Sequence, residues 1–540
     1  MDDRRTLEQL YLGGTITRRQ MLMGMGMLAA GVSIASVLAA CGGASTGGTG
    51  GTPKRGGNFR LGVTGGGAKD LMDGQTIITK PDQARLVTSF ETLLSYDEDY
   101  KLGTDGLAES ATQDAPDQWT IRLKQGIQWH NGKTLNADDV IYSFKRMLDK
   151  NNGLFGRAGL ASIDPNGITK MDERTVRLKL LQADSTIGEQ LGQYYNGMVP
   201  DGYKRYNSQD ASTHAQVGTG PYKLKSFTPG QQSVHERNPN YWRSGQPYFD
   251  TVTIIDFTDP AAQVNALLGG QVDAITDIPF AQVDAVRAHS GLAVLESPGG
   301  GWLPLCMAID LAPFNNNDVR QAFRYIVDRQ AFVNQVLSGH GRIANDLYAP
   351  FDACFASDLP QRKQDLDKAK SLLQKAGYAG ATFDLHTTDG AAGMVDSANI
   401  FAQQAKGAGI TINVHNDPNY YGDAYLKLAF SVDFWGTRSY LPQVGNGSLP
   451  TAPYNECHWP PSDSNYIQLY HQALAETDKT KRCQIVHDMQ KLEYDQGGYI
   501  IPFFNDLVDG YSTKVSGFKP SKGTLNLTSF GHGYRTIWFG

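Results

Sequence analysis

Two periodicities alternate along this chain. Residues 119–123 and 175–180 place apolar side chains at every second position, which predicts strands with one buried face. Residues 136–148 follow the helical period instead, with Asn136 where an N-cap is expected and apolar side chains recurring every three or four positions. Asp259-Pro260 predicts the start of another helix, which ends before Gly269. Short strands that alternate with capped helices predict a mixed α/β protein.

The longest helical pattern lies in the second half of the chain. It starts at Asp318 and stops at Gly339, and it predicts one continuous helix. The apolar face of this helix consists of Val319, Ala322, Phe323, Ile326 and Val333. A further helix is expected to open at Asp365 or Asp367 and to end at Gly377.

A compact unit follows that helix. Residues 382–388, 397–408 and 410–414 predict a strand, a helix and a second strand. A crossover of this kind joins parallel strands and is almost always right-handed. We therefore expect a parallel strand pair in this part of the chain.

The N-terminus has the pattern of an export signal. Arg18-Arg19 precedes an uncharged run over residues 21–40 that is diluted by glycine and serine, as in twin-arginine signals. Leu38-Ala39-Ala40-Cys41 resembles a bacterial lipobox, which predicts that Cys41 receives a lipid. The alternative is an uncleaved N-terminal anchor helix. Both interpretations place the bulk of the protein outside the cytoplasm.

Composition narrows the function classes. Residues 42–57 are rich in glycine and predict a flexible tether. The chain has 49 basic and 55 acidic residues among 540, a net charge of −6, so it lacks the basic excess that nucleic-acid binding requires. Hydrophobic residues make up 40% of the chain, which is enough for several cores and excludes disorder for most of it.

Four cysteines remain besides Cys41. In an oxidising compartment they permit disulfides in three connectivities. Cys457 and Cys483 are close in sequence and are a candidate pair that would bridge two neighbouring helices, while isolated buried thiols are the other interpretation for these two and for Cys306 and Cys354. No Cys-x-x-Cys occurs, which argues against a zinc ribbon or a thioredoxin-like site.

Enzyme motifs are missing from the sequence. It contains no Gly-x-Ser-x-Gly and no His-Glu-x-x-His. Gly132-Lys133-Thr134 lacks the upstream glycine of a phosphate loop and predicts a β-turn, and His130 beside it has the context of a structural histidine. These absences favour a binding protein, whose site needs only a concave, partly apolar surface with a few polar groups. We expect no cofactor and no resident metal.

Six motifs together carry a resemblance to a known family. They occur in family order over residues 55–510 and resemble the family 5 extracellular solute-binding proteins, the peptide/nickel/opine class, of bacterial ABC importers. The motifs are Trp119 to Val140, Val217-Gly-Thr-Gly-Pro-Tyr222, Asn238-Pro-Asn-Tyr-Trp242, Ala266-Leu-Leu-Gly-Gly-Gln-Val-Asp273, Pro313-Phe314 with Val319-Arg-Gln-Ala-Phe323 and Asp328-Arg329, and Asp367 to Gly377.

The resemblance implies a two-lobe, periplasmic-binding-protein-like clamp of type II with a subdomain inserted in the first lobe. The ligand would be enclosed between the lobes, because closure removes water and strengthens polar contacts. The implied boundaries are 1–40 for the signal, 41–57 for the tether, 58–88 with 218–304 and 507–540 for lobe I, 89–217 for the inserted subdomain and 305–506 for lobe II. The implied partners are a peptide or similar small solute and the permease subunits of the transporter.

The resemblance also identifies a ligand-binding segment. In the dipeptide and oligopeptide receptors of this family, a Trp-containing stretch of the second lobe supplies an Asp that pairs with the free amino group of the peptide. The corresponding stretch here is residues 433–442, where Arg438 stands about where that Asp is expected. We therefore expect Arg438 to contact an acidic or carbonyl-rich ligand, with Trp435 and Tyr440 packing against it. Weaker candidates are Trp302, Tyr421, Asn455 and Trp459.

Two other functions compete with peptide capture. The first is binding of a metal chelate or haem by the same fold, with His458 or His415 near the cleft. The second is a secreted hydrolase, against which the missing nucleophile motifs argue. The expected state is a lipid-anchored monomer in the periplasm or on the outer face of the cytoplasmic membrane, exported by the twin-arginine route.

Overall fold

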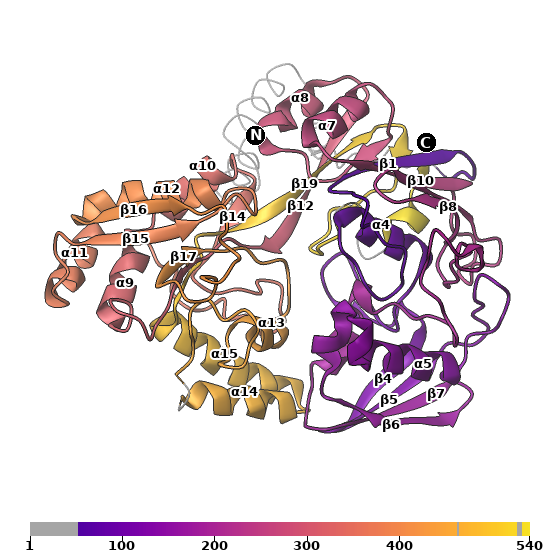
Figure 1. Ribbon diagram of the computed structural model, residues 1–540, viewed down its shortest axis with the longest axis horizontal. Helices are drawn as coiled ribbons and strands as arrows, with labels where there is room; N and C mark the ends of the chain where they lie inside the picture. Colours follow the sequence, from indigo (N-terminus) through magenta and orange to yellow (C-terminus); the bar gives the residue numbers. More distant parts are fainter. Residues whose placement is uncertain (1–51, 462–463, 526, 528–531) are drawn as a thin grey trace, which may run out of the picture. The chain divides into compact units, whose positions relative to one another are not determined.

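The computed structural model describes residues 52–461, 464–525, 527 and 532–540. The predicted signal, Cys41 and the first part of the predicted tether lie outside these residues. Within the described part most strands belong to three sheets, of eight, five and four strands (Figure 1). No helix in the described part is both long enough and apolar enough to cross a bilayer.

The eight-stranded sheet takes most of its strands from the ranges expected for lobe I. Its order is β12-β19-β11-β1-β10-β9-β8, with β14 paired to β19. The strands are β1 Asn58–Thr64, β8 Tyr222–Thr228, β9 Gln232–Arg237, β10 Thr251–Phe257, β11 Ala274–Ile275, β12 Leu292–Gly301, β14 Gly341–Ile343 and β19 Phe503–Ser512. Strand β1 is parallel to both β10 and β11, and its alternate residues Phe59, Leu61 and Val63 are buried. β14 lies inside the range expected for lobe II, yet it pairs in this sheet.

The longer helices in the ranges expected for this lobe are α4 Lys80–Ser89, α7 Pro260–Leu268 and α8 Val283–Ala288. The prediction for α7 is confirmed, because the Asp259 side chain accepts from the Ala261 amide and Pro260 fills the first turn. Helix α4 carries the fully buried Arg85, which pairs with Asp70, Asp82 and Asp256.

The range expected for the inserted subdomain, residues 89–217, contains a four-stranded antiparallel sheet, β4-β5-β7-β6, covered by helix α5. Its larger elements are β4 Ala108–Ala115, β5 Gln118–Leu123, β6 Ile163–Asp172, β7 Thr175–Leu180 and α5 Ala137–Leu148. The predicted strands over 119–123 and 175–180 are confirmed, and burial alternates along β5 as the sequence period requires. Asn136 caps α5 by accepting from the amides of Asp138 and Asp139, also as predicted.

Shorter elements complete this part of the chain. They are β2 Ser95–Tyr96, β3 Leu102–Gly103, helix α6 Ile187–Gln190 and the 3₁₀ turns Phe155–Leu160 and Tyr194–Asn196. At the C-terminus, β20 Val515–Ser516 pairs with β21 Trp538–Phe539, and helix α16 covers His532–Thr536.

Lobe II is built on the five-stranded sheet β16-β15-β17-β13-β18. Its strands are β13 Leu305–Met307, β15 Thr382–Thr387, β16 Thr411–Asn416, β17 Phe430–Val432 and β18 Tyr499–Ile500. The predicted parallel pair is confirmed, since β15 and β16 run parallel with Thr382 opposite Thr411 and helix α12, Met394–Ala405, between them. Helix α11, Leu366–Lys375, is capped by Asp365, the first of the two residues proposed for its start.

The prediction of a single continuous helix from Asp318 to Gly339 was wrong. The chain forms two helices, α9 Asn317–Ile326 and α10 Arg329–Val336. Val327 is extended, and the Asp328 side chain accepts from the Ala331 amide, so that Asp328 caps a new helix. The apolar period continues through the break because both helices bury their faces in the same core.

The chain first passes from the eight-stranded to the five-stranded sheet where β12 ends, because β13 follows it directly. The last residues of β12, Gly299, Gly300 and Gly301, leave no space for a side chain. A Cβ at Gly299 would lie 2.3 Å from the Asn505 carbonyl oxygen of β19, and one at Gly300 would lie 2.9 Å from the Thr437 side chain. The glycines therefore allow three chain segments to meet at the passage between the lobes.

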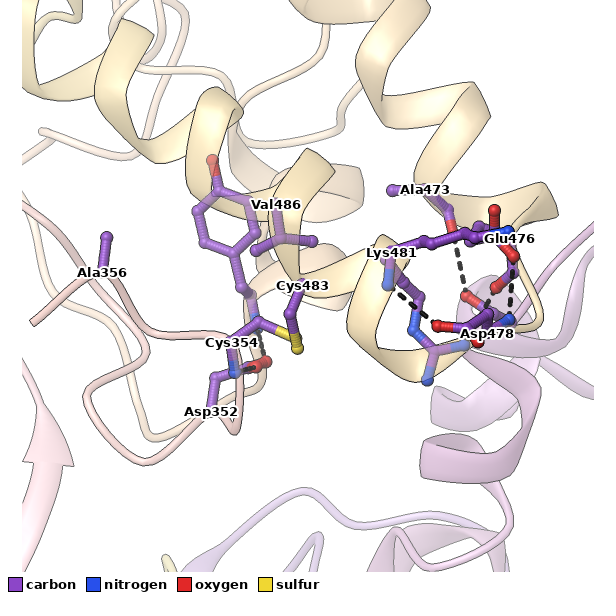
Figure 2. Close-up of a disulfide and its surroundings, with 12 residues drawn as sticks. Asp352, Cys354, Ala356, Ala473, Glu476, Asp478, Lys481, Cys483 and Val486 are labelled. Atoms are coloured by element: carbon purple, nitrogen blue, oxygen red, sulfur yellow. Dashed lines mark hydrogen bonds between the residues drawn. A yellow bond between two sulfur atoms is a disulfide. The ribbon is translucent and has the colours of Figure 1, made fainter.

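Helices α13 Tyr440–Gly447, α14 Asn465–Ala475 and α15 Lys479–Gln496 complete lobe II. The disulfide attached to α15 corrects the expected pairing: Cys483 bonds Cys354, which is 129 residues away in sequence (Figure 2). Cys457 and Cys306 are buried free thiols. The bond ties the loop around Cys354 to α15 instead of joining two neighbouring helices.

Candidate ligand-binding site

The segment predicted to bind ligand follows β17 and lies against the passage between the lobes. Trp435 and Trp302 exchange two main-chain hydrogen bonds of 2.9 and 3.0 Å, and their rings stack with centroids 6.0 Å apart. The next residue, Gly436, is exposed, and its amide and carbonyl have no hydrogen-bond partner among the described residues. One edge of this short ladder is thus open to another extended chain.

Arg438 carries a positive charge that no carboxylate neutralises within the described part of the chain. Its guanidinium carbon lies 5.0 Å from the centre of the Trp435 ring, and Nη1 donates to Gln443 Oε1 at 3.3 Å. The side chain is half-buried. A guanidinium held between a ring and an amide oxygen keeps its other N–H groups available for an acceptor.

A tyrosine wall faces Arg438 from the side of the inserted subdomain. We use this name for Tyr96, Tyr100, Tyr194 and Tyr195. The rings of Tyr96 and Tyr100 stack at 4.5 Å, and those of Tyr194 and Tyr195 meet edge to face at 5.1 Å. Burial raises the pKa of Tyr100, Tyr194 and Tyr195, and the charge of Arg438 lowers the pKa of all three.

Two hydroxyls of the tyrosine wall differ in their surroundings. The Tyr194 hydroxyl accepts from Gln83 Nε2 at 2.9 Å. The Tyr195 hydroxyl has no hydrogen-bond partner among residues that the structure describes, although its ring is packed edge to face on Phe155 at 4.8 Å. Tyr195 therefore offers a fixed ring with a free hydroxyl.

Direct contacts join the subdomain to lobe II beside the wall. The Ser185 amide donates to the Leu474 carbonyl of α14 at 2.9 Å. The rings of Tyr100 and Phe351 lie 6.4 Å apart. Glu189 of α6 faces lobe II, and burial raises its pKa to about 8, so this carboxyl is largely protonated at neutral pH.

Tyr440 lies deeper than expected. It is fully buried, and its hydroxyl donates to Glu493 Oε2 at 3.0 Å, while Tyr348 and Tyr466 each donate to Oε1 at 2.6 Å. Burial raises the pKa of Glu493 to about 7. The Tyr440 ring stacks on the Tyr348 ring with centroids 5.2 Å apart, and the Tyr348 ring in turn stacks on Trp302 at 5.4 Å. Tyr440 and Trp302 thus form the layer beneath Trp435.

The remaining predicted residues occupy two further places. Tyr421 is 46% exposed and donates at 3.3 Å to Oδ1 of Asp433, the first residue of the binding segment. Asn455 donates to the carbonyls of Leu449 and Trp459, both at 2.9 Å, and so fixes its own loop. Trp459 is 4% exposed and packs on Tyr466. The structure thus brings Trp302, Trp435, Arg438 and Tyr440 together and places Asn455 and Trp459 behind them.

The residues that sequence reasoning missed are the tyrosine wall and Gln443. The only local signal was the Tyr194-Tyr195 doublet in a polar stretch. Nothing in the sequence places that doublet opposite a residue more than 240 positions later.

The histidines named for a metal or haem site are paired individually. His415 Nε2 lies 2.9 Å from Asp384 Oδ1, and His458 contacts Asp310 and the Leu426 carbonyl. Among the described residues no group of three or more His, Cys, Asp or Glu side chains is arranged to hold a metal ion.

Comparison with known families identifies the chain. Residues 104–452 match the model of the bacterial extracellular solute-binding proteins, family 5. The protein belongs to this family. Family 5 proteins are solute-binding components of ABC importers and are not enzymes.

Two relatives show how broad the family is. The dipeptide-binding protein of Pseudomonas aeruginosa is 24% identical over 487 residues, covering 82% of this chain and 89% of the relative. Heme-binding protein A of Haemophilus influenzae is 26% identical over 300 residues, covering 52% of this chain and only 53% of the relative. The chain therefore matches about half the length of the haem-binding relative.

The fold is shared with solved binding proteins. AgaA of A. tumefaciens R10, solved in complex with agropinic acid, superposes with a TM-score of 0.72 at 22% identity, covering 90% of this chain and 99% of that one. The expected mixed α/β, two-lobe fold is confirmed by this similarity.

Proposed function

We propose that this family 5 protein captures peptides or similar small solutes between its lobes and delivers them unaltered to the permease of an ABC importer. The observation that carries the proposal is the surface at 435–438, where an open main-chain edge at Gly436 adjoins the unneutralised Arg438. An extended ligand adds to such an edge through its own amides and carbonyls. The relatives include proteins named for dipeptides and for glutathione, which supports a peptide-like ligand.

Arg438 is proposed to select the ligand group beside that edge. A guanidinium stacked on an aromatic ring favours a carboxylate or another acceptor-rich group over an amine. Trp435 supplies the ring, and Trp302 and Tyr440 keep that ring in place from below. Tyr421 is retained as a candidate at the rim, and Asn455 and Trp459 are proposed to act by supporting the loop behind the site.

The anchoring of the protein belongs to the same proposal. The twin-arginine signal, the lipid on Cys41 and the glycine-rich tether would hold a monomeric receptor close to its permease outside the cytoplasmic membrane. Labelled palmitate incorporated by the wild type but not by a Cys41→Ala variant would support this part, and equal incorporation would refute it.

Native mass spectrometry of the purified protein tests the function directly. We expect a retained small solute, recovered chemically intact, and a smaller radius of gyration in X-ray scattering when that solute is saturating. Calorimetry on Arg438→Ala should then show weaker binding. Superimposable scattering curves would refute closure around the solute. A chemically altered solute would refute delivery without reaction, and wild-type affinity in Arg438→Ala would refute the role of Arg438.

Haem or a metal chelate is the second candidate, favoured by the similarity to heme-binding protein A. It predicts a coloured or metal-containing preparation. A colourless, metal-free protein that retains a peptide would decide against it.

A further inference from the structure

We propose that a cavity at the end of helix α5 is a second binding site and that it takes a phosphate group. The cavity has a volume of about 420 Å³ and is lined by Tyr142, Arg146, Asn151, Asn152, Tyr203 and Arg205. This volume lies in the range of small-molecule sites in proteins. None of the lining residues belongs to the segment 433–442, so this inference goes beyond the proposed function and stands or falls separately from it.

The first argument is an excess of positive charge at the wall of the cavity. Arg146 and Arg205 share one carboxylate, that of Asp73, whose side chain is fully buried. Arg146 donates to Asp73 Oδ1 at 3.1 Å and to Oδ2 at 2.7 Å, and Arg205 Nε donates to Oδ2 at 2.7 Å. The lining itself contains no Asp or Glu. Two guanidiniums against one carboxylate leave one positive charge in excess.

The second argument is that Arg205 has donors left over. Asp73 uses only its Nε, and the two Nη nitrogens have no partner among the residues that the structure describes. The Arg205 side chain is 38% exposed, so a solute can reach these N–H groups. The paired Nη groups of a guanidinium match two oxygens of a phosphate group in spacing and direction.

The third argument is that Arg146 is fixed before a ligand arrives. Besides its two bonds to Asp73, its Nη1 donates to Gln75 Oε1 at 2.7 Å. Its guanidinium carbon lies 5.1 Å from the centre of the Tyr203 ring, and its side chain is only 10% exposed. A partly buried charge is screened little by dissolved salt, so its attraction for an anion in the cavity persists. A fixed side chain also loses little entropy on binding.

The fourth argument is that the acceptors beside the cavity already have donors. Asn152 Nδ2 donates at 3.0 Å to the Arg146 carbonyl, at the end of α5. The nearby carboxylate of Asp149 accepts from the main-chain amide and from Nδ2 of Asn151, both at 2.9 Å. An incoming anion therefore meets paired acceptors and the unpaired N–H groups of Arg205, which is the arrangement that an anion site requires.

Calorimetry with inorganic phosphate tests the site in the full-length protein. We expect the wild type to bind phosphate at low ionic strength and to bind it more weakly as salt is added. Arg205→Gln should weaken this binding about tenfold or more, because charge-assisted hydrogen bonds are lost. Arg287→Gln is the matched control, since Arg287 is 52% exposed and pairs at 2.8 Å with a carboxylate of its own, Asp284, and it should bind phosphate as the wild type does.

A second variant tests the cavity without removing a charge. Asn151→Trp places a large side chain at the exposed rim, and it should also weaken phosphate binding about tenfold because it fills the space. Circular dichroism verifies that each variant is folded. Acetate is titrated in parallel, and we expect it to bind about tenfold more weakly than phosphate, because it has fewer oxygens for the two arginines.

The phosphate group can belong to a soluble compound or to a lipid headgroup at the membrane where the proposed anchor would hold the protein. Sedimentation with phosphatidylglycerol vesicles separates these sources. Binding to vesicles that Arg205→Gln reduces several-fold assigns the group to a lipid. Equal sedimentation of wild type and Arg205→Gln, together with phosphate binding that requires Arg205, assigns it to a soluble compound.

Three results would overturn the inference. They are a wild type that binds no phosphate at low ionic strength, equal affinities for acetate and phosphate, and equal phosphate binding by Arg205→Gln and Arg287→Gln. None of them bears on solute capture at 435–438, which native mass spectrometry tests on its own.

Discussion

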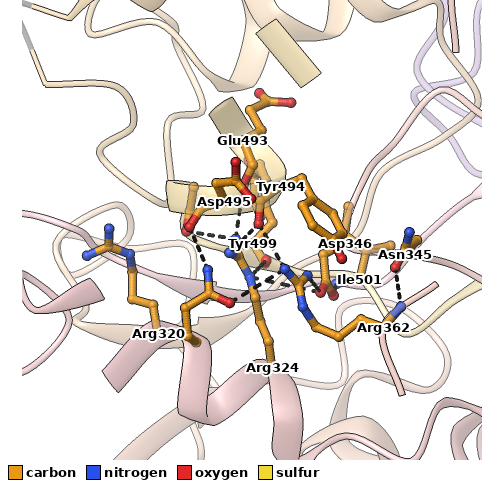
Figure 3. A network of polar contacts seen from close by, with 12 residues as sticks. Arg320, Arg324, Asn345, Asp346, Arg362, Glu493, Tyr494, Asp495, Tyr499 and Ile501 are labelled. Carbon is orange, nitrogen blue, oxygen red and sulfur yellow. Dashed lines mark hydrogen bonds and ion pairs between the residues drawn. The ribbon is translucent and has the colours of Figure 1, made fainter. Parts of the chain in front are cut away.

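Replacing Asp346 by asparagine should destabilise lobe II strongly, because this buried carboxylate is shared by three buried arginines. Arg329 Nη2 donates to both of its oxygens at 2.8 and 2.7 Å. Arg362 pairs with Asp346 Oδ2, and Arg324 Nε lies 3.9 Å from the same oxygen (Figure 3). The Ile501 amide donates to Oδ1 at 3.0 Å. Asparagine keeps the shape and removes the only anion in the group.

The expected loss can be derived from these contacts. Removing one partner of a buried ion pair costs about 3–5 kcal/mol. Arg324 keeps its hydrogen bonds to main-chain carbonyls, for example to Tyr499 at 3.1 Å and Gly497 at 2.7 Å. These bonds place the expected loss for Asp346→Asn at the lower end, about 3 kcal/mol at pH 7.

The stability difference between wild type and Asp346→Asn should depend on pH in a defined direction. Burial alone would raise the pKa of Asp346, but Arg329, Arg362 and Arg324 together hold it below 3.8. A carboxylate with a lowered pKa in the folded state stabilises the protein above pH 4 and loses this effect as the pH falls through its folded pKa. Asparagine does not titrate, so the difference between wild type and variant should shrink below pH 4.

Urea unfolding followed by tryptophan fluorescence measures both effects. Asp284→Asn is the control, because Asp284 is 94% exposed and pairs with Arg287 on the surface, and we expect it to change stability by less than about 0.5 kcal/mol. A loss below 1 kcal/mol for Asp346→Asn at pH 7, or a loss that is the same at pH 7 and pH 3, would contradict the reasoning.

Three further predictions concern other parts of the chain. Replacing Cys354 and Cys483 together by alanine should cost about 3–5 kcal/mol, since the bond closes a loop of more than one hundred residues; a melting temperature unaffected by the change would rule this out. Burial raises the pKa of Glu493 to about 7, so the folded state binds a proton more tightly than the unfolded state, and wild-type stability should fall as the pH rises from about 4.5 to about 7; Glu493→Gln should remove about 3 kcal/mol of this fall, and parallel pH profiles of the two proteins would speak against it. A Cβ at Gly218 would lie 1.8 Å from the carbonyl at the end of α4, so Gly218→Ala should lose about 1–3 kcal/mol in urea unfolding; Gly67→Ala, where a Cβ meets nothing within 4 Å, is its control, and equal stability of the two variants would disprove the clash.

Local physics explains which elements could be predicted from the sequence. Asn136 and Asp259 cap their helices through side-chain contacts that span only two or three residues, so a short window contains the whole interaction. The parallel pair of β15 and β16 was predictable for a similar reason, because strand, helix and strand follow one another directly. The break at Val327 was missed because Asp328 can either continue a helix face or cap a new helix, and only packing decides between these.

Long-range contacts explain the errors and omissions. The partner of Cys483 is 129 residues away, and no pattern along the chain connects the two. Arg438 could be proposed from the sequence because it lies three positions after Trp435 in a stretch that resembles the family's ligand-binding segment, and its role stays a prediction. Tyr195 was not found, because only the folded chain brings the inserted subdomain to face lobe II.

The three glycines at the end of β12 have a consequence for how affinity can change. A methyl group at Gly299 would push against the Asn505 carbonyl on the paired strand β19, and both strands belong to the eight-stranded sheet. It would loosen this strand pair at the point from which the chain continues into the other lobe. Substitution at Gly299 is therefore expected to alter the freedom of the crossover, and through it the grip on any solute, before it alters a side chain that contacts one.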